Sequence, residues 1–170
     1  NDNLWLTTAS YFIYRFDGRE FFQHRISLAN YYGRISTYKI IADDQSIWIL
    51  TNLGLVKYDG KKYTLVPMDE KLKIGFNSKL ILDHNKRIWI CDEAGEIFRM
   101  ESGRIKKMPE VRQKANEPIA GFYGDAQLAF FSKGGITVHV EDNQTIRSGK
   151  LDWLPDEEIF SILQINDVYY

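Results

Sequence analysis

Short apolar runs separated by turn residues recur along the whole chain, and three of them carry a tryptophan at the same place. The strings NLWLTT, SIWILTN and RIWICDE align Trp5, Trp48 and Trp89, at spacings of 43 and 41 residues. Weaker copies align Ala129 and Tyr169 with these tryptophans, after 40 residues each. A period of about 20 to 50 residues is typical of repeat architectures. The pattern therefore predicts one structural unit per copy.

Each copy is interpreted as four short strands joined by tight turns. Glycine follows the aligned position by six residues at Gly54, Gly95 and Gly135, which suits a turn with positive φ. Asp-Gly between apolar runs, as at Asp59-Gly60, indicates a hairpin. No stretch of ten or more residues shows a helical apolar stripe, so we expect few helices. In the second and third copies we expect strands at 38–42, 47–51, 55–58, 62–66, 79–82, 88–91, 97–100 and 104–108.

The second strand of each copy is nearly all apolar, as in SIWIL and RIWIC. Such a strand must be buried on both faces, whereas a two-layer sandwich leaves one face wet and produces alternation. Four-stranded antiparallel sheets covered on both faces by their neighbours are the blades of a β-propeller. We therefore predict an all-β fold for residues 1–170, a propeller fragment of about four four-stranded antiparallel blades. The aligned positions then pack between blades, and they are Trp5, Trp48, Trp89, Ala129 and Tyr169.

The two ends of the chain fall at the same point of the repeat. Both lie on the second strand of a blade, so they duplicate rather than complete each other. We expect a piece of a larger propeller, whose remaining blades and domains are partners of this segment. An unpaired sheet edge can pair with the edge of another chain. The sequence is therefore compatible with a homodimer.

Composition and charge exclude several classes of partner. The chain is 44% hydrophobic and 26% charged, which is typical of a globular protein with a substantial core. With 22 basic and 23 acidic residues the net charge is −1, so no excess attracts nucleic acid or an anionic membrane. No apolar run approaches the roughly 18 residues of a membrane span, and we expect membrane attachment only through other parts of the parent protein.

The residues that usually carry chemistry are scattered. His24, His84 and His139 are 60 and 55 residues apart, which is not the spacing of a metal site. The single cysteine, Cys91, excludes an intrachain disulfide and is interpreted as a small buried hydrophobe. Acidic residues such as Asp43 fall in turns and are interpreted as solvated charge. We find no phosphate-binding loop, nucleophile elbow or kinase motif, and we predict no catalytic residue, no metal and no cofactor.

The clearest copy also resembles a known repeat. The segment QSIWILTNLGLVKYDGKKYTLV, residues 45–66, carries the pattern Trp-(Leu/Ile)-x-Thr-x-x-Gly-Leu-x-x-Tyr-Asp-Gly, and it is similar to the two-component regulator propeller repeat. The first copy lacks the glycine, the third departs at Tyr-Asp-Gly, and the fourth has lost the tryptophan.

This resemblance implies a sensor region of a hybrid histidine kinase of gut Bacteroidetes. In that family two seven-bladed propellers and an immunoglobulin-like domain precede a membrane helix and the kinase. The resemblance further implies a periplasmic, extracytoplasmic part of an inner-membrane protein that responds to oligosaccharides.

Candidate binding residues come from the loops that join an outermost strand to the next innermost strand, since loops on a rigid scaffold carry function. Four such loops are expected, at 27–37, 68–78, 110–118 and 150–158. Aromatic rings beside amides and guanidinium groups suit a sugar, whose C–H face stacks on a ring. The same rings also fit packing over the propeller rim, and both interpretations stay open. The candidates are Asn30, Tyr31, Tyr32, Arg34 and Trp153.

Three functions follow from these expectations. The first is a glycan-responsive sensor propeller that binds an oligosaccharide without turnover. The second is a protein–protein interaction scaffold, whose exposed face docks other proteins. The third is a propeller-based lyase, which would need a convergent acid and base that the sequence does not reveal.

Overall fold

The structure is a computed structural model that describes residues 3–8, 10–83 and 86–108 in full, together with the backbone of six short strands between residues 119 and 169. Blade 1 consists of β1 (Leu4–Thr7), β2 (Phe12–Phe16) and β3 (Phe21–Arg25). Blade 2 consists of β4 (Thr37–Ala42), β5 (Ile47–Thr51), β6 (Gly54–Tyr58) and β7 (Tyr63–Leu65). Blade 3 consists of β8 (Lys79–Leu82), β9 (Ile88–Cys91), β10 (Ile97–Glu101) and β11 (Arg104–Lys107).

Two further sheets follow along the chain. Blade 4 consists of β12 (Ile119–Phe122), β13 (Leu128–Ser132), β14 (Gly135–His139) and β15 (Thr145–Arg147). A last pair consists of β16 (Gln164–Ile165) and β17 (Val168–Tyr169). Within each sheet, strands that follow one another in sequence pair antiparallel, and no helix occurs among the described residues. The predicted all-β fold of four-stranded antiparallel blades is confirmed.

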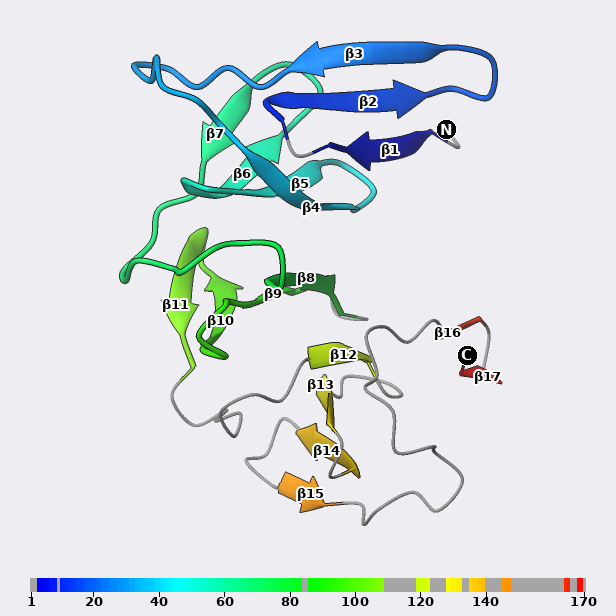
Figure 1. Cartoon of the computed structure of the whole chain (residues 1–170), viewed down its shortest axis with the longest axis vertical. Coiled ribbons are helices and arrows are strands. Elements are labelled where there is room, and N and C mark those ends of the chain that lie inside the picture. The colour runs from blue at the N-terminus through cyan, green and yellow to red at the C-terminus, as the bar shows by residue number, and fades with distance from the viewer. Residues whose placement is uncertain are drawn as a thin grey trace.

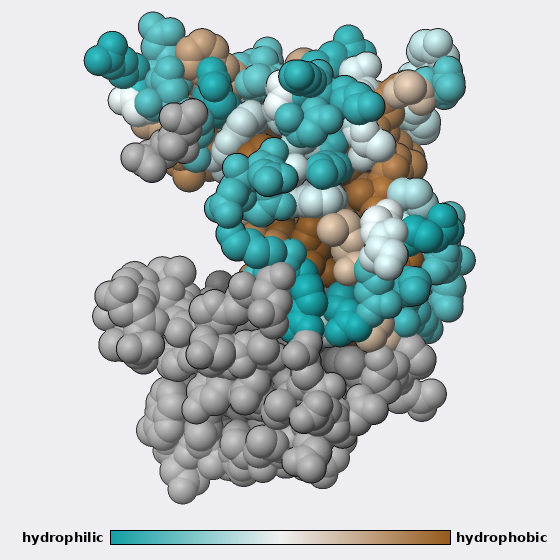
Figure 2. Space-filling view, turned by 180° about the vertical axis from the view of Figure 1, so that it is seen from behind, coloured by the Kyte–Doolittle hydropathy of each residue, from teal (hydrophilic) through white to brown (hydrophobic). Residues whose placement is uncertain are grey.

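The sheets follow one another in space as they do in sequence. In Figure 1 blades 1 to 4 lie in a row from the top of the picture to the bottom, with β4, β8 and β12 near the middle. These innermost strands also contact one another, β4 with β8 and β8 with β12. Figure 2 shows hydrophobic residues mainly in the recessed middle of the described part, between outer groups of hydrophilic residues.

The predicted strand bounds agree with the structure to within a residue or so at each end. The predictions at 47–51, 79–82 and 88–91 match β5, β8 and β9. The turns follow the predicted chemistry, since Gly54 and Gly95 have φ of 130° and 77°, conformations that glycine adopts without a steric penalty. Ala129 lies in β13 and Tyr169 in β17, each in the second-strand position that the repeat assigns.

The second strands of blades 2 and 3 are buried on both faces, as predicted, whereas exposed and half-buried residues alternate along β1 of blade 1. Trp48 and Trp89 are 5% and 7% exposed. Successive residues of β5 face opposite neighbours: Trp48 packs against blade 3, whereas Ile49 packs against blade 1. The packing between blades is therefore made by both faces of one strand, which is why its sequence is continuously apolar.

Two apolar clusters hold the described blades together. The cluster between blades 1 and 2 comprises Ile13, Ile26, Leu28, Ile35, Ile49 and Val56. The cluster between blades 2 and 3 comprises Trp48, Leu50, Leu55, Val66, Leu72, Leu80, Ile88, Ile90, Phe98 and Ile105. Cys91 is buried beside Trp89, and its interpretation as a small hydrophobe is confirmed. Burial raises the pKa of the Cys91 thiol to about 12, so the thiol is not a nucleophile near neutral pH.

The interpretation of Asp43 as solvated charge is wrong. Asp43 is half-buried, and its carboxylate accepts the indole N–H of Trp48 at 2.7 Å and the backbone amides of Gln45 and Ser46 at 2.8 and 2.7 Å. Burial alone raises the pKa of Asp43, but these hydrogen bonds outweigh it and lower the pKa. In blade 3 Asp83 accepts the indole N–H of Trp89 in the same way, at 2.9 Å.

Candidate functional site

The loops that enter blades 2 and 3 lie at one end of the blades, and each is anchored to the turn between the second and third strands of the blade it enters. In blade 2 the Asn52 side chain accepts the Ser36 amide at 2.8 Å and donates to the Arg34 carbonyl at 3.2 Å. In blade 3 the Glu93 carboxylate accepts the Asn77 amide at 3.2 Å. Asn52 and Glu93 both follow the aligned tryptophan by four residues. The repeat therefore places one anchor at the same position in blades 2 and 3.

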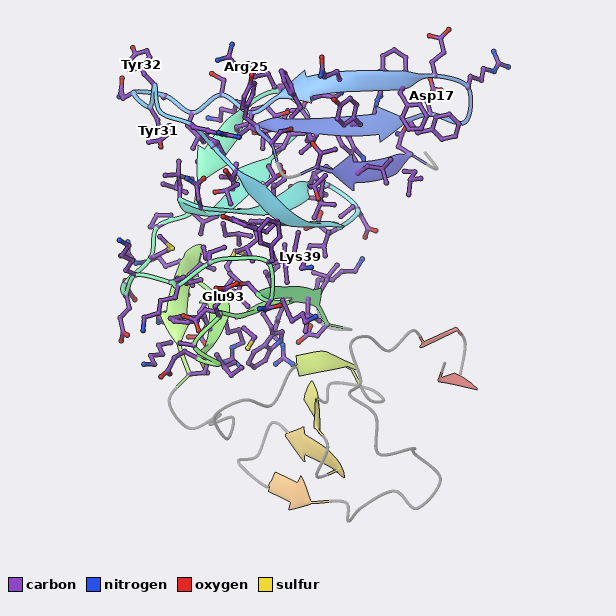
Figure 3. The ribbon with its side chains drawn as sticks, in the orientation of Figure 1. Asp17, Arg25, Tyr31, Tyr32, Lys39 and Glu93 are labelled. Atoms are coloured by element: carbon purple, nitrogen blue, oxygen red, sulfur yellow. The ribbon has the colours of Figure 1, made fainter. Side chains whose placement is uncertain are left out.

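The candidate residues of the first loop have different roles. Tyr31 packs against the cluster between blades 1 and 2, and its hydroxyl donates to the Arg34 carbonyl at 3.3 Å. Asn30 is in the left-handed region with φ of 62° and shapes the turn, whose Tyr31 amide donates to the Leu28 carbonyl. Tyr32 is 98% exposed, and Figure 3 shows it at the outer end of the loop.

The sequence left two interpretations open for these rings, sugar binding and packing over the propeller rim. Packing over the rim holds for Tyr31, whereas Tyr32 and the Arg34 side chain are exposed to solvent. Among the described residues, the first loop has no other exposed aromatic ring beside Tyr32. Trp153 and the loops at 110–118 and 150–158 lie outside the described residues.

The second loop presents an aromatic ring that the sequence analysis did not single out. Phe76 lies at the tip of a tight turn closed by the Ser78 amide, which donates to the Gly75 carbonyl at 3.2 Å, while the Gly75 amide donates to the Ser78 hydroxyl at 3.0 Å. The Phe76 side chain is 70% exposed. A side chain at Gly75 would lie 2.1 Å from a Glu93 oxygen, so glycine is needed there to let the anchor approach.

The base of this turn is held by blade 3. The Asp92 carboxylate, in a residue only 5% exposed, accepts the amides of Lys73, Ala94 and Glu96 at 3.0, 2.9 and 3.0 Å. The Glu93 amide donates to the Lys73 carbonyl at 2.8 Å. Phe76 is thus exposed on a loop whose backbone is fixed, which lowers the conformational entropy that a ligand would have to remove.

Phe76 meets the innermost strand of blade 2. Its ring lies edge-on to that of Tyr38, with centroids 5.4 Å apart and an interplanar angle of 84°. Lys39 follows Tyr38 in β4, and Lys79 begins β8. We call Tyr38, Lys39, Phe76 and Lys79 the inner group.

The two lysines of the inner group occupy equivalent positions. Lys39 is the cross-strand partner of Leu50, and Lys79 is that of Cys91; Leu50 and Cys91 each follow the aligned tryptophan by two residues. Figure 3 shows Lys39 in the region between β4 and β8. Burial lowers the pKa of Lys79, and the nearby charge of Lys39 lowers it further.

The sequence contains a pattern that points to these residues, although the positions of the loops alone do not reveal it. Both lysines stand at the start of an innermost strand in successive copies, and Phe76 lies in a loop already expected at 68–78. The contact of Phe76 with Tyr38 depends on β4 and β8 being neighbours, and Tyr38 lies at an irregularity of β4 between Thr37 and Lys39. Register of this kind is not readable from a 41-residue spacing.

No three His, Cys, Asp or Glu side chains of the described residues are grouped so as to hold a metal ion. None of the described elements is a helix of the length and apolar character needed to span a bilayer.

Fold and site together define a β-propeller that carries an aromatic and cationic group at the inner end of two blades. The structure is similar to the extracellular domain of BT4673, described as a one-component system from B. thetaiotaomicron, with 22% identity, 98% of this chain covered and a TM-score of 0.67. It is also similar to the extracellular domain of the hybrid two-component system BT3049 from the same organism, with 18% identity, 96% coverage and a TM-score of 0.66.

Enzymes share this fold as well. A catalytically inactive variant of virginiamycin B lyase from Staphylococcus aureus, solved with quinupristin, has 14% identity and a TM-score of 0.63 over 90% of this chain, which corresponds to 54% of the lyase. The chain spans only 24% of the length of each of the BT4673 and BT3049 domains. No protein-family model matches the sequence, and no curated protein matches it either.

Proposed function

We propose that this chain is a ligand-binding propeller module of a two-component signalling receptor, a hybrid histidine kinase, and that it detects an oligosaccharide outside the cytoplasm without converting it. The observation that carries the proposal is the exposed ring of Phe76, which lies on an anchored loop and against Tyr38. An aromatic face stacks on the C–H face of a sugar, and polar groups nearby bind its hydroxyls. The likeness to extracellular domains of bacterial signalling systems supports the same assignment.

The proposal includes further blades beyond those described, in a larger and seven-bladed propeller. One cross-strand pair has the same position in each of the first three blades, and its members are Leu6–Tyr14, Ile49–Val56 and Ile90–Phe98. The pairs of blades 2 and 3 are 0–2% exposed because the preceding blade covers them. In blade 1 Leu6 is 39% exposed, and Leu4 beside it is 54% exposed. We assign another blade of the parent protein to this face.

The test is a panel of oligosaccharides titrated into the full-length protein, with binding read by calorimetry and turnover by chromatography of the sugar. We expect binding of at least one oligosaccharide with no new product. Phe76→Ala should weaken it roughly 3- to 10-fold, since ring contacts of this kind contribute about 0.5–1.5 kcal/mol.

The matched control is Phe21→Ala, which removes a 61% exposed ring from the outermost strand of blade 1 and should leave the affinity unchanged. Accumulation of a cleaved or unsaturated product contradicts the proposal in favour of a lyase. Absence of binding across the panel, together with saturable binding of a purified protein partner abolished by Phe76→Ala, contradicts it in favour of a scaffold.

A further inference from the structure

Blade 1 carries a stacked pair of aromatic rings on the face that points away from blade 2. Phe16 and Phe21 are cross-strand partners, and their ring centroids lie 4.7 Å apart at an interplanar angle of 29°. Leu4 pairs with Phe16. Because successive side chains of a strand alternate between its faces, Leu4 lies opposite Trp5, which packs against the cluster between blades 1 and 2.

The described residues leave this pair largely uncovered. Phe21 is 61% exposed, and Leu4 is 54% exposed. Blade 1 forms one end of the row of blades in Figure 1. Contiguous apolar surface of this kind is typical of an interaction site. Leu4, Phe16 and Phe21 contribute no charge to it, so the surface suits an apolar partner.

Blade 2 contains an equivalent pair, and there the structure shows what lies against it. Tyr58 and Tyr63 are cross-strand partners whose rings stack with centroids 4.5 Å apart and an interplanar angle of 21°. The Trp5 ring of blade 1 meets Tyr58 edge-on, at 6.1 Å between centroids and 64°. The Tyr63 hydroxyl is buried. The aligned tryptophan of one blade therefore packs on the ring pair of the next.

The contact between blades 2 and 3 repeats this arrangement with aliphatic side chains. Met100 and Ile105 are cross-strand partners, and Met100 follows the residue paired with the aligned tryptophan, as Phe16 and Tyr58 do. Ile105 is 1% exposed and belongs to the same apolar cluster as Trp48, against which Met100 also packs. Both described contacts thus bring the tryptophan of one blade together with the cross-strand pair of the next.

We propose that the stacked rings of Phe16 and Phe21 are the docking site for a tryptophan of another blade of the parent protein, which packs on blade 1 as blade 1 packs on blade 2. The inference rests on the proposed function, which assigns another blade to this face, and it adds the side chain that makes the contact. An aromatic edge on a stacked pair combines burial of apolar area with quadrupole attraction.

A second copy of this chain fits the site less well. A symmetric dimer uses the same patch on both subunits, so the two Phe16–Phe21 pairs would face each other. Trp5 lies on the opposite face of blade 1 and packs toward blade 2. It would make no contact in such a dimer.

Hydroxyl-radical oxidation of the full-length protein, read by mass spectrometry, tests whether the pair is covered. Phe76 is the matched reference, because it is the same type of residue and is 70% exposed, against 61% for Phe21. We expect Phe21 to be oxidised several-fold more slowly than Phe76 in the absence of sugar. Equal rates of oxidation would show an open surface and overturn the inference.

A photo-reactive ring at position 21 identifies the occupant. Phe21→p-azidophenylalanine in the full-length protein should cross-link within the same chain, to a segment outside residues 1–170 and at or beside a tryptophan. The control is Phe22→p-azidophenylalanine. Phe22 pairs with Arg15, the partner of Trp5, so its ring lies on the other face and should cross-link within residues 1–170.

The outcomes separate the inference from the proposed function. A cross-link from position 21 to a parent segment without a tryptophan overturns the tryptophan contact and leaves the larger propeller standing. A cross-link between two copies overturns it in favour of a homodimer. Absence of a cross-link at position 21 overturns it when position 22 does cross-link. If the labelled protein does not fold, the oxidation of the unmodified protein still decides whether the pair is covered.

Rapid oxidation of Phe21 overturns both the inference and the assignment of another blade to this face. The oligosaccharide proposal stays separate, because it depends on Phe76 in the loop that enters blade 3 and is measured by calorimetry.

Discussion

Two of the aligned tryptophans, Trp48 and Trp89, are held by the same two kinds of partner. An aspartate in the preceding turn accepts the indole N–H, Asp43 for Trp48 and Asp83 for Trp89. A cation on the next strand covers the ring: Lys57 Nζ lies 5.1 Å from the Trp48 ring centroid, and the Arg99 guanidinium carbon lies 4.9 Å from that of Trp89. The repeat therefore specifies a buried ring with its one polar atom satisfied and its face covered.

Removal of the Asp43 carboxylate tests how much this arrangement stabilises a blade. Asp43→Ala leaves the Trp48 indole and two turn amides without their acceptor. We expect a loss of about 1–3 kcal/mol in the free energy of unfolding. Urea unfolding of the protein and the variant measures it.

The matched control lies one residue away. The Asp44 side chain is 83% exposed, and among the described residues it pairs only with Lys86, at 2.7 Å. Asp44→Ala should change the free energy of unfolding by less than about 1 kcal/mol, as exposed ion pairs do. An equal loss in both variants would show that the indole and amide hydrogen bonds contribute nothing measurable.

At the scale of elements, the packing of blade 1 on blade 2 contains a titratable group. His24 of β3 lies against Trp5 of β1 and Tyr58 of β6, with ring centroids 5.3 and 6.0 Å apart. Its Nε2 atom is buried, and so are Arg15 Nε and the Tyr63 hydroxyl; none of the three has a hydrogen-bond partner among the described residues. Burial lowers the pKa of His24, and the charge of Arg15 lowers it further.

The lowered pKa of His24 predicts that the folded protein loses stability as the pH falls. Because the folded-state pKa of His24 is below the value of about 6.5 for the unfolded chain, the unfolded state binds the proton first. The contribution of His24 to stability is complete above pH 6.5 and decreases as the pH falls from there toward the folded-state pKa. His24→Phe keeps a ring against Trp5 and removes the proton. We expect the variant to lose less stability than the parent between about pH 7 and pH 5.

Thermal unfolding at a series of pH values gives the comparison. A parallel decrease in the midpoint temperatures of the protein and His24→Phe would contradict the assignment. Tyr63 does not titrate in this comparison, because burial raises the pKa of Tyr63 to about 12, far above the range tested.

At the scale of the whole molecule, the exposed face of blade 1 gives the strongest test of the larger propeller. Leu6 occupies the position of Ile49 and Ile90, both 0% exposed. If another blade covers Leu6, Leu6→Asp buries a charge and removes an apolar contact, and we expect a loss of about 2 kcal/mol or more. Chemical unfolding of the full-length protein provides the value.

Leu65 is the matched control, since it is a strand leucine of the same 39% exposure. It lies in the outermost strand β7, where no blade is expected to cover it, and Leu65→Asp should change stability by less than about 0.5 kcal/mol. Equal, small effects of the two substitutions would mean that the face of blade 1 is free in the whole protein.

The repeat itself and the strand boundaries were readable from the sequence, because they depend on local chemistry. A 41- to 43-residue spacing of tryptophan, continuous apolar runs and Asp-Gly turns each act over a few residues, so their pattern determines four-stranded blades buried on both faces. The burial of Cys91 followed from its alignment with Leu50 for the same reason.

Tertiary structure alone decided which side chains meet. Tyr31 packs into a cluster while the adjacent Tyr32 is fully exposed, and composition cannot distinguish them because the loop backbone sets their directions. Asp43 looked like surface charge until the fold placed an indole N–H beside it. Tyr38 and Phe76 are far apart in the chain, and only the contact between β4 and β8 and the anchored turn at Gly75 bring their rings together. Propeller blades are specified locally, whereas a binding site at their inner ends depends on contacts between neighbouring blades.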